Sequence, residues 1–542
     1  MLDRRELMKL TAVGATAAAL PRAALARQEE ATREVPAVPG DDFPFAERTI
    51  AELQKAMGAG ELSAVGLTRA YLRRIEETDQ AGPELRSVLA INPEAEQIAR
   101  RLDDERRGGS VRGALHGIPI LLKDNLDTGD RMLTTAGSLA LAGTSAPRDS
   151  TVAAKLREAG AVLLGKANLS EWANFRSTRS SSGWSAVGGQ TRNPYVLDRN
   201  PCGSSSGSGA AASANLCAAA IGTETDGSIV CPSNANGLVG IKPTVGLVSR
   251  SGIVPISHTQ DTAGPMARTV ADAAAVLSAI AGADPRDPAT EAAREGVESN
   301  YTRFLDPAGL RGARIGVVRG MAGFHAEVDA LFEEALAAMK EAGAELVDPV
   351  ELKVDGAGEH EWQVLLYEFK HDLETYLRER GRTAEVRTLK ELIDFNVRHR
   401  EREMPWFGQE IFEQAAEKGP LTESAYLEAL HACRRITRDD GIDRVLAKHE
   451  LDALVAPTGS PAWPTDWVNG DHFVGGSSSA AAVSGYPAVA VPMGFVHGLP
   501  VDVSFFGRAW SEGVLIRVGF AFEQATQARR PPAFRASLRA TA

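Results

Sequence analysis

Apolar and polar residues alternate along this chain in blocks that predict β-strands separated by α-helices. GIPILLKDN is a short apolar run that ends in polar residues, which predicts a buried strand with Lys123 at its end. Residues 150–167 begin with an N-cap at Ser150, continue as a helix that stops at Gly160, and end in the strand AVLLG. The order strand, helix, strand returns in ARIGVVRG, VDALFEEALAAMKEAG and AELVDPVEL. This alternation predicts an α/β fold with a buried sheet.

A mainly helical segment interrupts the alternation. Residues 360–450 contain EWQVLLYEFKHDLETYL and TLKELIDFNVRHRE, whose apolar residues recur at helical spacing. Strand-like segments flank this stretch, and LDALVAPT and YPAVAVPM predict further strands after it. We therefore expect residues 43–542 to form one large domain, in which residues 360–450 are an excursion from the sheet.

The first 42 residues have a different pattern. Residues 1–26 combine the pair Arg4 and Arg5, a short apolar run and an Ala-Leu-Ala site, which is typical of a twin-arginine export signal. A basic amphipathic helix at the start of the fold is the alternative. Residues 27–42 are polar and contain proline, which predicts a linker. Because the apolar run is too short to cross a bilayer of about 30 Å, we expect a periplasmic or secreted protein without stable membrane insertion after signal removal.

The formal net charge of −12 argues against a nucleic acid as the partner. Nucleic-acid binding depends on clustered lysine and arginine side chains. We therefore expect no nucleic-acid partner. The sequence does not predict an oligomeric state.

The four cysteines are Cys202, Cys217, Cys231 and Cys433. They show no C-x-x-C spacing of the kind that indicates zinc. The simplest interpretation is that all four are small buried residues. A disulfide among the first three is the alternative, because an exported protein can form one.

The stretch CGSSSGSGAAASANLCAAAIGTETDGSIVCPS, from Cys202 to Ser233, raises the question of a nucleophilic serine. One interpretation is structural, because serine and glycine form turns and alanines allow close helix packing. A second is a nucleophile elbow at Ser205, within G-S-S-S-G. That motif needs a buried strand before it, and the preceding QTRNPYVLDRNPC contains two prolines and several charges.

A third interpretation places the base far upstream, at Lys123. A free lysine titrates near pH 10.4, so a largely neutral side chain at pH 7 needs a downward shift of about 3–4 units, which full burial can supply. A lysine at the end of an apolar run can equally extend its amine to the solvent. The neighbouring motifs decide between these alternatives.

Six segments occur in a characteristic order: GIPILLKDN, TTAGS, GAVLLGKANLSEW, GSSSGS, GTETDGSIVCPSNANGLVGIKPT and DTAGPMART. This series resembles the amidase signature family, most of all its bacterial peptide-amidase branch. The resemblance covers about residues 50–277, with a signature core near 110–280, and returns in LVAPT and GYPAVAVPMGFVHGLPV. It implies a single large domain with a central mixed, twisted β-sheet flanked by α-helices.

The resemblance also implies a Ser–cis-Ser–Lys triad. Ser228 would attack the carbonyl carbon, Ser204 would relay the proton, and neutral Lys123 would accept it. The peptide bond between Gly203 and Ser204 would be cis. The backbone N–H groups of the oxyanion hole would be those of Thr225, Asp226, Gly227 and Ser228.

The chain departs from the family pattern at several positions. Glu224 replaces the usual aspartate, Asp226 stands where a glycine of the turn is common, and Val230 replaces an arginine. Asp502 also replaces a common glycine. A carboxylate at position 226 is compatible with a neighbouring oxyanion only if it points away or is paired.

We therefore expect an amide hydrolase that acts on the C-terminal carboxamide of peptides through an acyl-enzyme, with a small-molecule or short-peptide amide as its partner. An amidase for fatty, aryl or oligomeric nylon-like amides is the alternative. A component of a tRNA-dependent amidotransferase fits less well, because export and acidity argue against it. A catalytically inactive binding protein is disfavoured by the complete triad. No metal ligand cluster and no phosphate-binding loop stands out, so we expect no metal and no cofactor.

Overall fold

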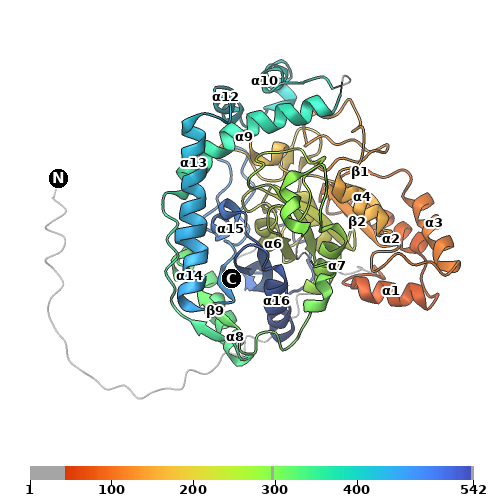
Figure 1. Cartoon of the computed structure of the whole chain (residues 1–542). Helices are drawn as coiled ribbons and strands as arrows, with labels where there is room; N and C mark the ends of the chain where they lie inside the picture. Colours follow the sequence, from red (N-terminus) through yellow and green to blue (C-terminus); the bar gives the residue numbers. More distant parts are fainter. Residues whose placement is uncertain (1–42, 295–297, 382–383, 539–542) are drawn as a thin grey trace, which may run out of the picture. The chain divides into compact units, whose positions relative to one another are not determined.

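A mixed sheet of eleven strands forms the centre of the fold (Figure 1). The computed structural model describes residues 43–294, 298–381 and 384–538. In spatial order the strands are β1 (Val88–Ile91), β3 (Val162–Ala167), β2 (Pro119–Lys123), β6 (Ala219–Glu224), β8 (Thr262–Ala267), β7 (Val239–Lys242), β12 (Ala488–Val496), β13 (Leu499–Phe506), β11 (Ala453–Pro457), β9 (Arg314–Val317) and β10 (Glu345–Val347). Strand β2 pairs in parallel with β3 and β6, whereas β7, β8, β12 and β13 pair with their neighbours in antiparallel fashion. The predicted mixed α/β sheet is confirmed.

Helices surround this sheet (Figure 1). Before β9 the α-helices are α1 (Ile50–Gly58), α2 (Ala64–Ile75), α3 (Ala95–Arg107), α4 (Thr151–Glu158), α5 (Ser206–Ser213), α6 (Val230–Asn236) and α7 (Val270–Ile280). After β9 they are α8 (Ala326–Glu341), α9 (Ala357–Glu379), α10 (Leu389–Arg398), α11 (Arg400–Glu403), α12 (Glu410–Ala416), α13 (Ser424–Arg434), α14 (Asp443–His449), α15 (Ser478–Ser484) and α16 (Glu512–Thr526). The π-helical segment η7 (Arg435–Ile442) joins α13 to α14, and β4 (Trp184–Ser185) pairs with β5 (Gly189–Gln190) in a separate small sheet.

Both faces of the sheet are buried, as the apolar strand sequences predict. Along β12, Val489 and Val491 belong to the largest apolar cluster, whereas Ala488 and Ala490 belong to another cluster. Successive side chains of a strand point to opposite faces, so the two clusters cover the two sides. A strand that is buried on both faces has a continuous apolar sequence, which explains runs such as PILL and ALVA.

The sequence between β10 and β11 is helical, as predicted. Helix α9 contacts α10, α12 and α13, and the four helices lie as one group beside the sheet (Figure 1). Apolar side chains of α9, α10 and α12 form a cluster around Phe369, Phe412 and Leu373, which also includes Trp172 and Phe175 from an earlier part of the chain. Residues Asp42–Ala542 nevertheless form one compact unit, so the helical segment is an excursion within it.

The export signal predicted for residues 1–26 and the linker predicted for residues 27–42 lie outside the described residues. Within the described ranges, none of the helices has both the length and the apolar character that crossing a membrane requires. Both N-terminal assignments therefore remain predictions.

The cysteine prediction is partly wrong. Cys202 and Cys231 form a disulfide with a Cα–Cα distance of 5.9 Å, whereas Cys217 and Cys433 are free and buried, as expected. The bond connects the segment before Ser204 to the helix that follows Ser228. Sequence spacing could not reveal the pair, because the two cysteines become neighbours only when α5 and β6 fold between them.

Asp502 on β13 is a buried carboxyl group without a hydrogen-bond partner. It is 0% exposed, and neither oxygen of its side chain has a partner among the described residues. Burial raises the pKa of Asp502 well above its usual range, although the charge of Arg529 opposes this effect. The native protein therefore holds a proton there that the unfolded chain releases above about pH 4.

We expect Asp502→Asn to remove a pH-dependent loss of stability. Because the native pKa is raised, the stability of the wild type falls as the pH rises above about 4 towards that pKa, by about 1.4 kcal/mol per unit relative to the variant. Urea unfolding at pH 5 and pH 7 measures the difference. The control is Asp355→Asn, which changes an exposed carboxylate. A difference between the wild type and Asp502→Asn that is the same at both pH values would contradict the assignment.

Candidate active site

Strands β2 and β6 bring Lys123 to a polar site inside the fold. The two strands are parallel neighbours, so their carboxyl ends meet at the same edge of the sheet. Lys123, the last residue of β2, is 0% exposed. Its Nζ lies 2.8 Å from Thr223 Oγ1, 3.2 Å from Thr223 O and 2.7 Å from Ser204 Oγ.

These contacts fit an uncharged lysine. A neutral amine has two N–H groups and one lone pair. The two oxygens of Thr223 accept the two N–H groups, which leaves the lone pair directed at Ser204 Oγ. The second lone pair of Thr223 Oγ1 accepts from Asn125 Nδ2 at 2.9 Å. In its neutral form, the Lys123 amine therefore faces Ser204 as an acceptor.

Ser204 connects Lys123 to Ser228. The Oγ atoms of the two serines are 3.0 Å apart, and the backbone N–H of Ser204 also donates to Ser228 Oγ at 3.0 Å. The peptide bond between Gly203 and Ser204 is cis. Ser204 is 0% exposed and Ser228 is 8% exposed. The outer hydroxyl can thus reach a substrate, while the relay and the base are enclosed.

The turn before Ser228 presents unused backbone donors. Gly227 has φ +76°, and a Cβ atom added there would lie 3.1 Å from Ser478 Oγ. Among the hydrogen bonds of the described residues, none uses the backbone N–H of residues 225–228 as a donor. A short turn with free N–H groups beside a nucleophile is the arrangement of an oxyanion hole.

Two carboxylates support this turn from outside. Glu224 Oε2 accepts from the backbone N–H groups of Ile229 and Val230 at 2.7 and 3.0 Å, and so fixes the chain after the nucleophile. The side chain of Asp226 is held by the hydroxyls of Ser478 and Ser479, both at 2.6 Å. Asp226 is therefore paired, so a carboxylate at this position is compatible with a neighbouring oxyanion.

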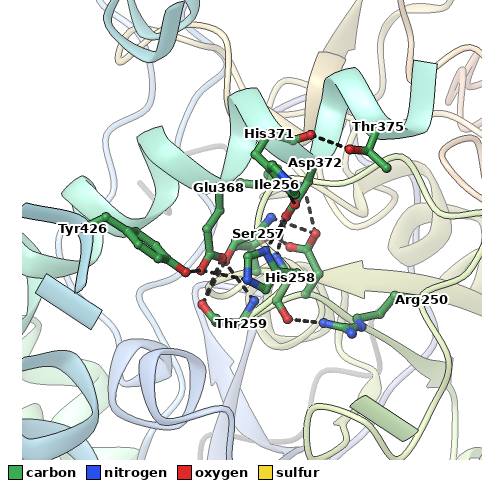
Figure 2. A network of polar contacts seen from close by, with 12 residues as sticks. Arg250, Ile256, Ser257, His258, Thr259, Glu368, His371, Asp372, Thr375 and Tyr426 are labelled. Atoms are coloured by element: carbon green, nitrogen blue, oxygen red, sulfur yellow. Dashed lines mark hydrogen bonds and ion pairs between the residues drawn. The ribbon is translucent and has the colours of Figure 1, made fainter. Parts of the chain in front are cut away.

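A polar network holds the turn against α9. Thr225 Oγ1 donates to Asp261 Oδ1 at 2.6 Å, and the other oxygen of Asp261 accepts from the backbone N–H groups of Ile256 and Ser257. Figure 2 shows how the same loop reaches α9: the hydroxyls of Ser257 and Thr259 donate to Glu368. The helical excursion therefore supports the loop that positions Thr225.

The described residues contain one group with the composition of a metal site: His258, Glu368 and Asp372, whose ligand atoms lie within 4.8 Å of one another (Figure 2). His258 Nδ1 lies 2.8 Å from Asp372 Oδ2, and Nε2 lies 3.4 Å from Glu368 Oε1. Burial lowers the pKa of His258, but the hydrogen bond that its ring donates to Asp372 and the negative charges of Glu368 and Asp372 raise it overall. Because each ring nitrogen faces a different carboxylate, the geometry favours an imidazolium that donates twice over a metal ligand with a free lone pair.

Ser205 is not placed as a nucleophile. Its hydroxyl donates to Thr223 O at 3.0 Å and accepts from Thr223 N at 3.1 Å, so it fastens the start of α5 to β6. The nucleophile-elbow interpretation is therefore not supported, whereas the three residues expected for the triad lie together. Sequence reasoning missed Thr223, Asp261 and the serine pair that holds Asp226, because each acts through a contact that only the fold creates.

The arrangement can break an amide by nucleophilic catalysis. Ser228 Oγ attacks the carbonyl carbon while its proton passes to Ser204 Oγ and the Ser204 proton passes to Lys123 Nζ. The N–H groups of the turn stabilise the oxyanion. When the C–N bond breaks, Lys123 and Ser204 return the proton to the leaving nitrogen by the same path. Water then attacks the acyl-serine by the same route and releases the acid.

The pH dependence of kcat/KM should follow the deprotonation of Lys123. Burial lowers the pKa of Lys123 to about 7, and the charges of Asp261 and Glu224 oppose this effect. Since the neutral amine is the base, we expect kcat/KM to rise about tenfold per unit below pH 7 and to level off above it. Initial rates at low substrate concentration between pH 5 and 9 measure this.

Asp261 needs a separate control, because burial raises the pKa of this carboxyl to about 6. Asp261→Asn removes its titration and one negative charge near Lys123. The rising limb should persist and move to lower pH. Loss of the limb in this variant would assign it to Asp261 instead.

Comparisons with known proteins show similarity to amidases. The model of the family described as Amidase matches residues 66–516. The crystal structure of a native peptide amidase from Stenotrophomonas maltophilia is similar, with 54% identity and a TM-score of 0.85 over 91% of this chain and 99% of that one. An Arabidopsis thaliana protein named as an amidase is 41% identical over 91% of this chain and 92% of its own. A glutamyl-tRNA(Gln) amidotransferase component from Halorhodospira halophila is 34% identical over 89% of this chain and 97% of its own.

Proposed function

The chain belongs to the Amidase family, and on that premise we propose that it hydrolyses the C-terminal carboxamide of peptides to the free acid and ammonia. The observation that carries the proposal is the connected path from Ser228 Oγ through Ser204 Oγ to Lys123 Nζ. The similarity to a peptide amidase supports this class of substrate.

The experiment is mass spectrometry of a short C-terminally amidated peptide incubated with the purified enzyme, with released ammonia assayed in parallel. We expect conversion to the free acid with all internal bonds intact. Cleavage of a simple aryl or fatty amide without conversion of the peptide would keep amide hydrolysis and replace the substrate class. Glutamine-dependent transfer to a charged tRNA would favour the amidotransferase alternative.

We also propose export through the twin-arginine route, on the pattern of residues 1–26. Replacing both Arg4 and Arg5 with lysine keeps the charge and removes the motif. Fractionation of cells that express either form should then find the wild type in the periplasm and the variant in the cytoplasm. An equal distribution of both forms would contradict export by this route.

A further inference from the structure

A cavity of about 560 Å³ lies outside the catalytic centre. Its wall combines residues after β7, the loop that carries Arg250 and His258, the end of α13 with η7, and the segment around Trp510. Lys123, Ser204 and Ser228 are not among its lining residues. The cavity shares Arg250 with the small pocket beside Thr223 and Thr225, and the mechanism above does not use it.

The lining is cationic. It contains Arg250, Arg434, Arg438 and His258, and no aspartate or glutamate. Two of these groups are already neutralised: Arg250 forms an ion pair with Asp287, and both nitrogens of His258 face carboxylates. The other two, Arg434 and Arg438, form no ion pair with any described residue at salt-bridge distance.

Arg434 and Arg438 are directed into the same space. They are four residues apart on the continuous helical path of α13 and η7, so they project from one side of it. Arg438 is fixed, because its Nε donates to Ser484 O at 2.7 Å and its guanidinium lies 5.5 Å from the centre of the Tyr486 ring. The nearby carboxylate of Asp443 is engaged by Tyr486 Oη at 2.7 Å.

Two like charges without an ion-pair partner among the described residues therefore face this cavity. Burial lowers the pKa of Arg438 and the like charge of Arg434 lowers it further, whereas Tyr486, Asp443 and Asp439 oppose this shift. An anion between the two guanidinium groups would relieve their repulsion and accept from their planar N–H groups.

The rest of the cavity offers an apolar surface. Trp510 is 43% exposed, and its backbone N–H donates to Thr244 Oγ1 at 2.9 Å, so the residue is held at the rim. Val245 and Leu430 add aliphatic surface to the lining. A ligand that fills this space therefore combines an anionic end with an aromatic or aliphatic body.

We propose that this cavity is a binding site for an organic monocarboxylate with an aryl or alkyl body. Its carboxylate lies between the guanidinium groups of Arg434 and Arg438, and its body lies against Trp510. The site is distinct from the catalytic centre and does not depend on which amide the enzyme hydrolyses.

Calorimetric titration of the full-length enzyme with 3-phenylpropionate tests the proposal. We expect saturable binding to the wild type at millimolar concentrations and at least about tenfold weaker binding of the neutral 3-phenylpropan-1-ol. The double variant Arg434→Ala, Arg438→Ala should weaken binding of the acid by at least about tenfold. Trp510→Ala should weaken it severalfold.

Arg435→Ala is the matched control, since it removes the same charge from the same helix outside the cavity. Arg435 is 62% exposed at its side chain and pairs with Asp440. It should bind the acid like the wild type. Arg438 also contacts Ser484, so the double variant could lose its fold together with that contact. The single variant Arg434→Gln changes an exposed position and tests the same site without that risk.

The proposal would be overturned by no saturable binding to the wild type, by equal weakening in Arg435→Ala, or by unchanged binding in Arg434→Gln. Inhibition of amide hydrolysis that is strictly competitive would also overturn it, because the acid would then occupy the catalytic centre. If the amidated peptide is not hydrolysed in the activity assay, that result does not bear on this binding site.

Discussion

Replacing Ser228 with alanine is expected to lower kcat by about 10⁴–10⁶-fold, because no other described hydroxyl is both connected to Lys123 and placed beside the free N–H groups of the turn. Ser228 Oγ is the outer end of the path through Ser204. The variant keeps the turn and the pairing of Asp226. Substrate binding should therefore change far less than turnover.

Ser205→Ala is the matched control for this prediction. Ser205 neighbours Ser204 and is also buried, but its hydroxyl contacts only Thr223. The change should cost some stability, about 1–3 kcal/mol, because the buried Thr223 groups lose a partner, yet turnover should survive. Single-turnover rates and the mass of the acyl-enzyme, measured on both variants, show which serine is the nucleophile. Loss of turnover in Ser205→Ala, together with normal turnover in Ser228→Ala, would overturn the assignment.

Replacing Lys123 with arginine is expected to lower kcat by about 10²–10⁴-fold and to abolish the rise of activity around pH 7. Arginine stays protonated at every accessible pH, so it cannot accept the proton of Ser204. The guanidinium also has no basic lone pair to direct at Ser204 Oγ while its N–H groups donate to the two oxygens of Thr223, as the Lys123 amine does. Rates measured from pH 6 to pH 9 give both effects.

Lys166→Arg distinguishes loss of the base from damage to packing. Lys166 on β3 is also fully buried, and its Nζ donates to Leu126 O and Thr134 Oγ1 instead of a catalytic serine. This variant should lose stability while its remaining activity keeps the wild-type pH profile. A Lys123→Arg enzyme that retained the same pH profile would show that another group is the base.

The periodic parts of the fold were predictable from the sequence. The end of β2 at Lys123, the N-cap of α4 at Ser150 and the helical stretch between β10 and β11 all follow from local patterns of apolar and capping residues. The triad followed from the order and spacing of motifs, since its members lie within one continuous signature region.

The support of the site could not be predicted in the same way. Asp226 is stabilised by Ser478 and Ser479, about 250 positions later in the chain, and no local pattern links them. Asp261 likewise matters through its contact with Thr225. Such contacts depend on how β6, α15 and the loop after β7 meet in space, and that information is absent from any single segment.

The disulfide between Cys202 and Cys231 has a consequence for damage by proteases. Together with the intervening chain it closes a covalent ring that contains both catalytic serines. A cut in the backbone inside this ring leaves the two pieces joined through sulfur, so the nicked protein still migrates as one molecule in electrophoresis without reductant. When the cut lies between Ser204 and Ser228, each serine stays attached on its own side of the cut, and one hydrolysed peptide bond is not enough to release either of them.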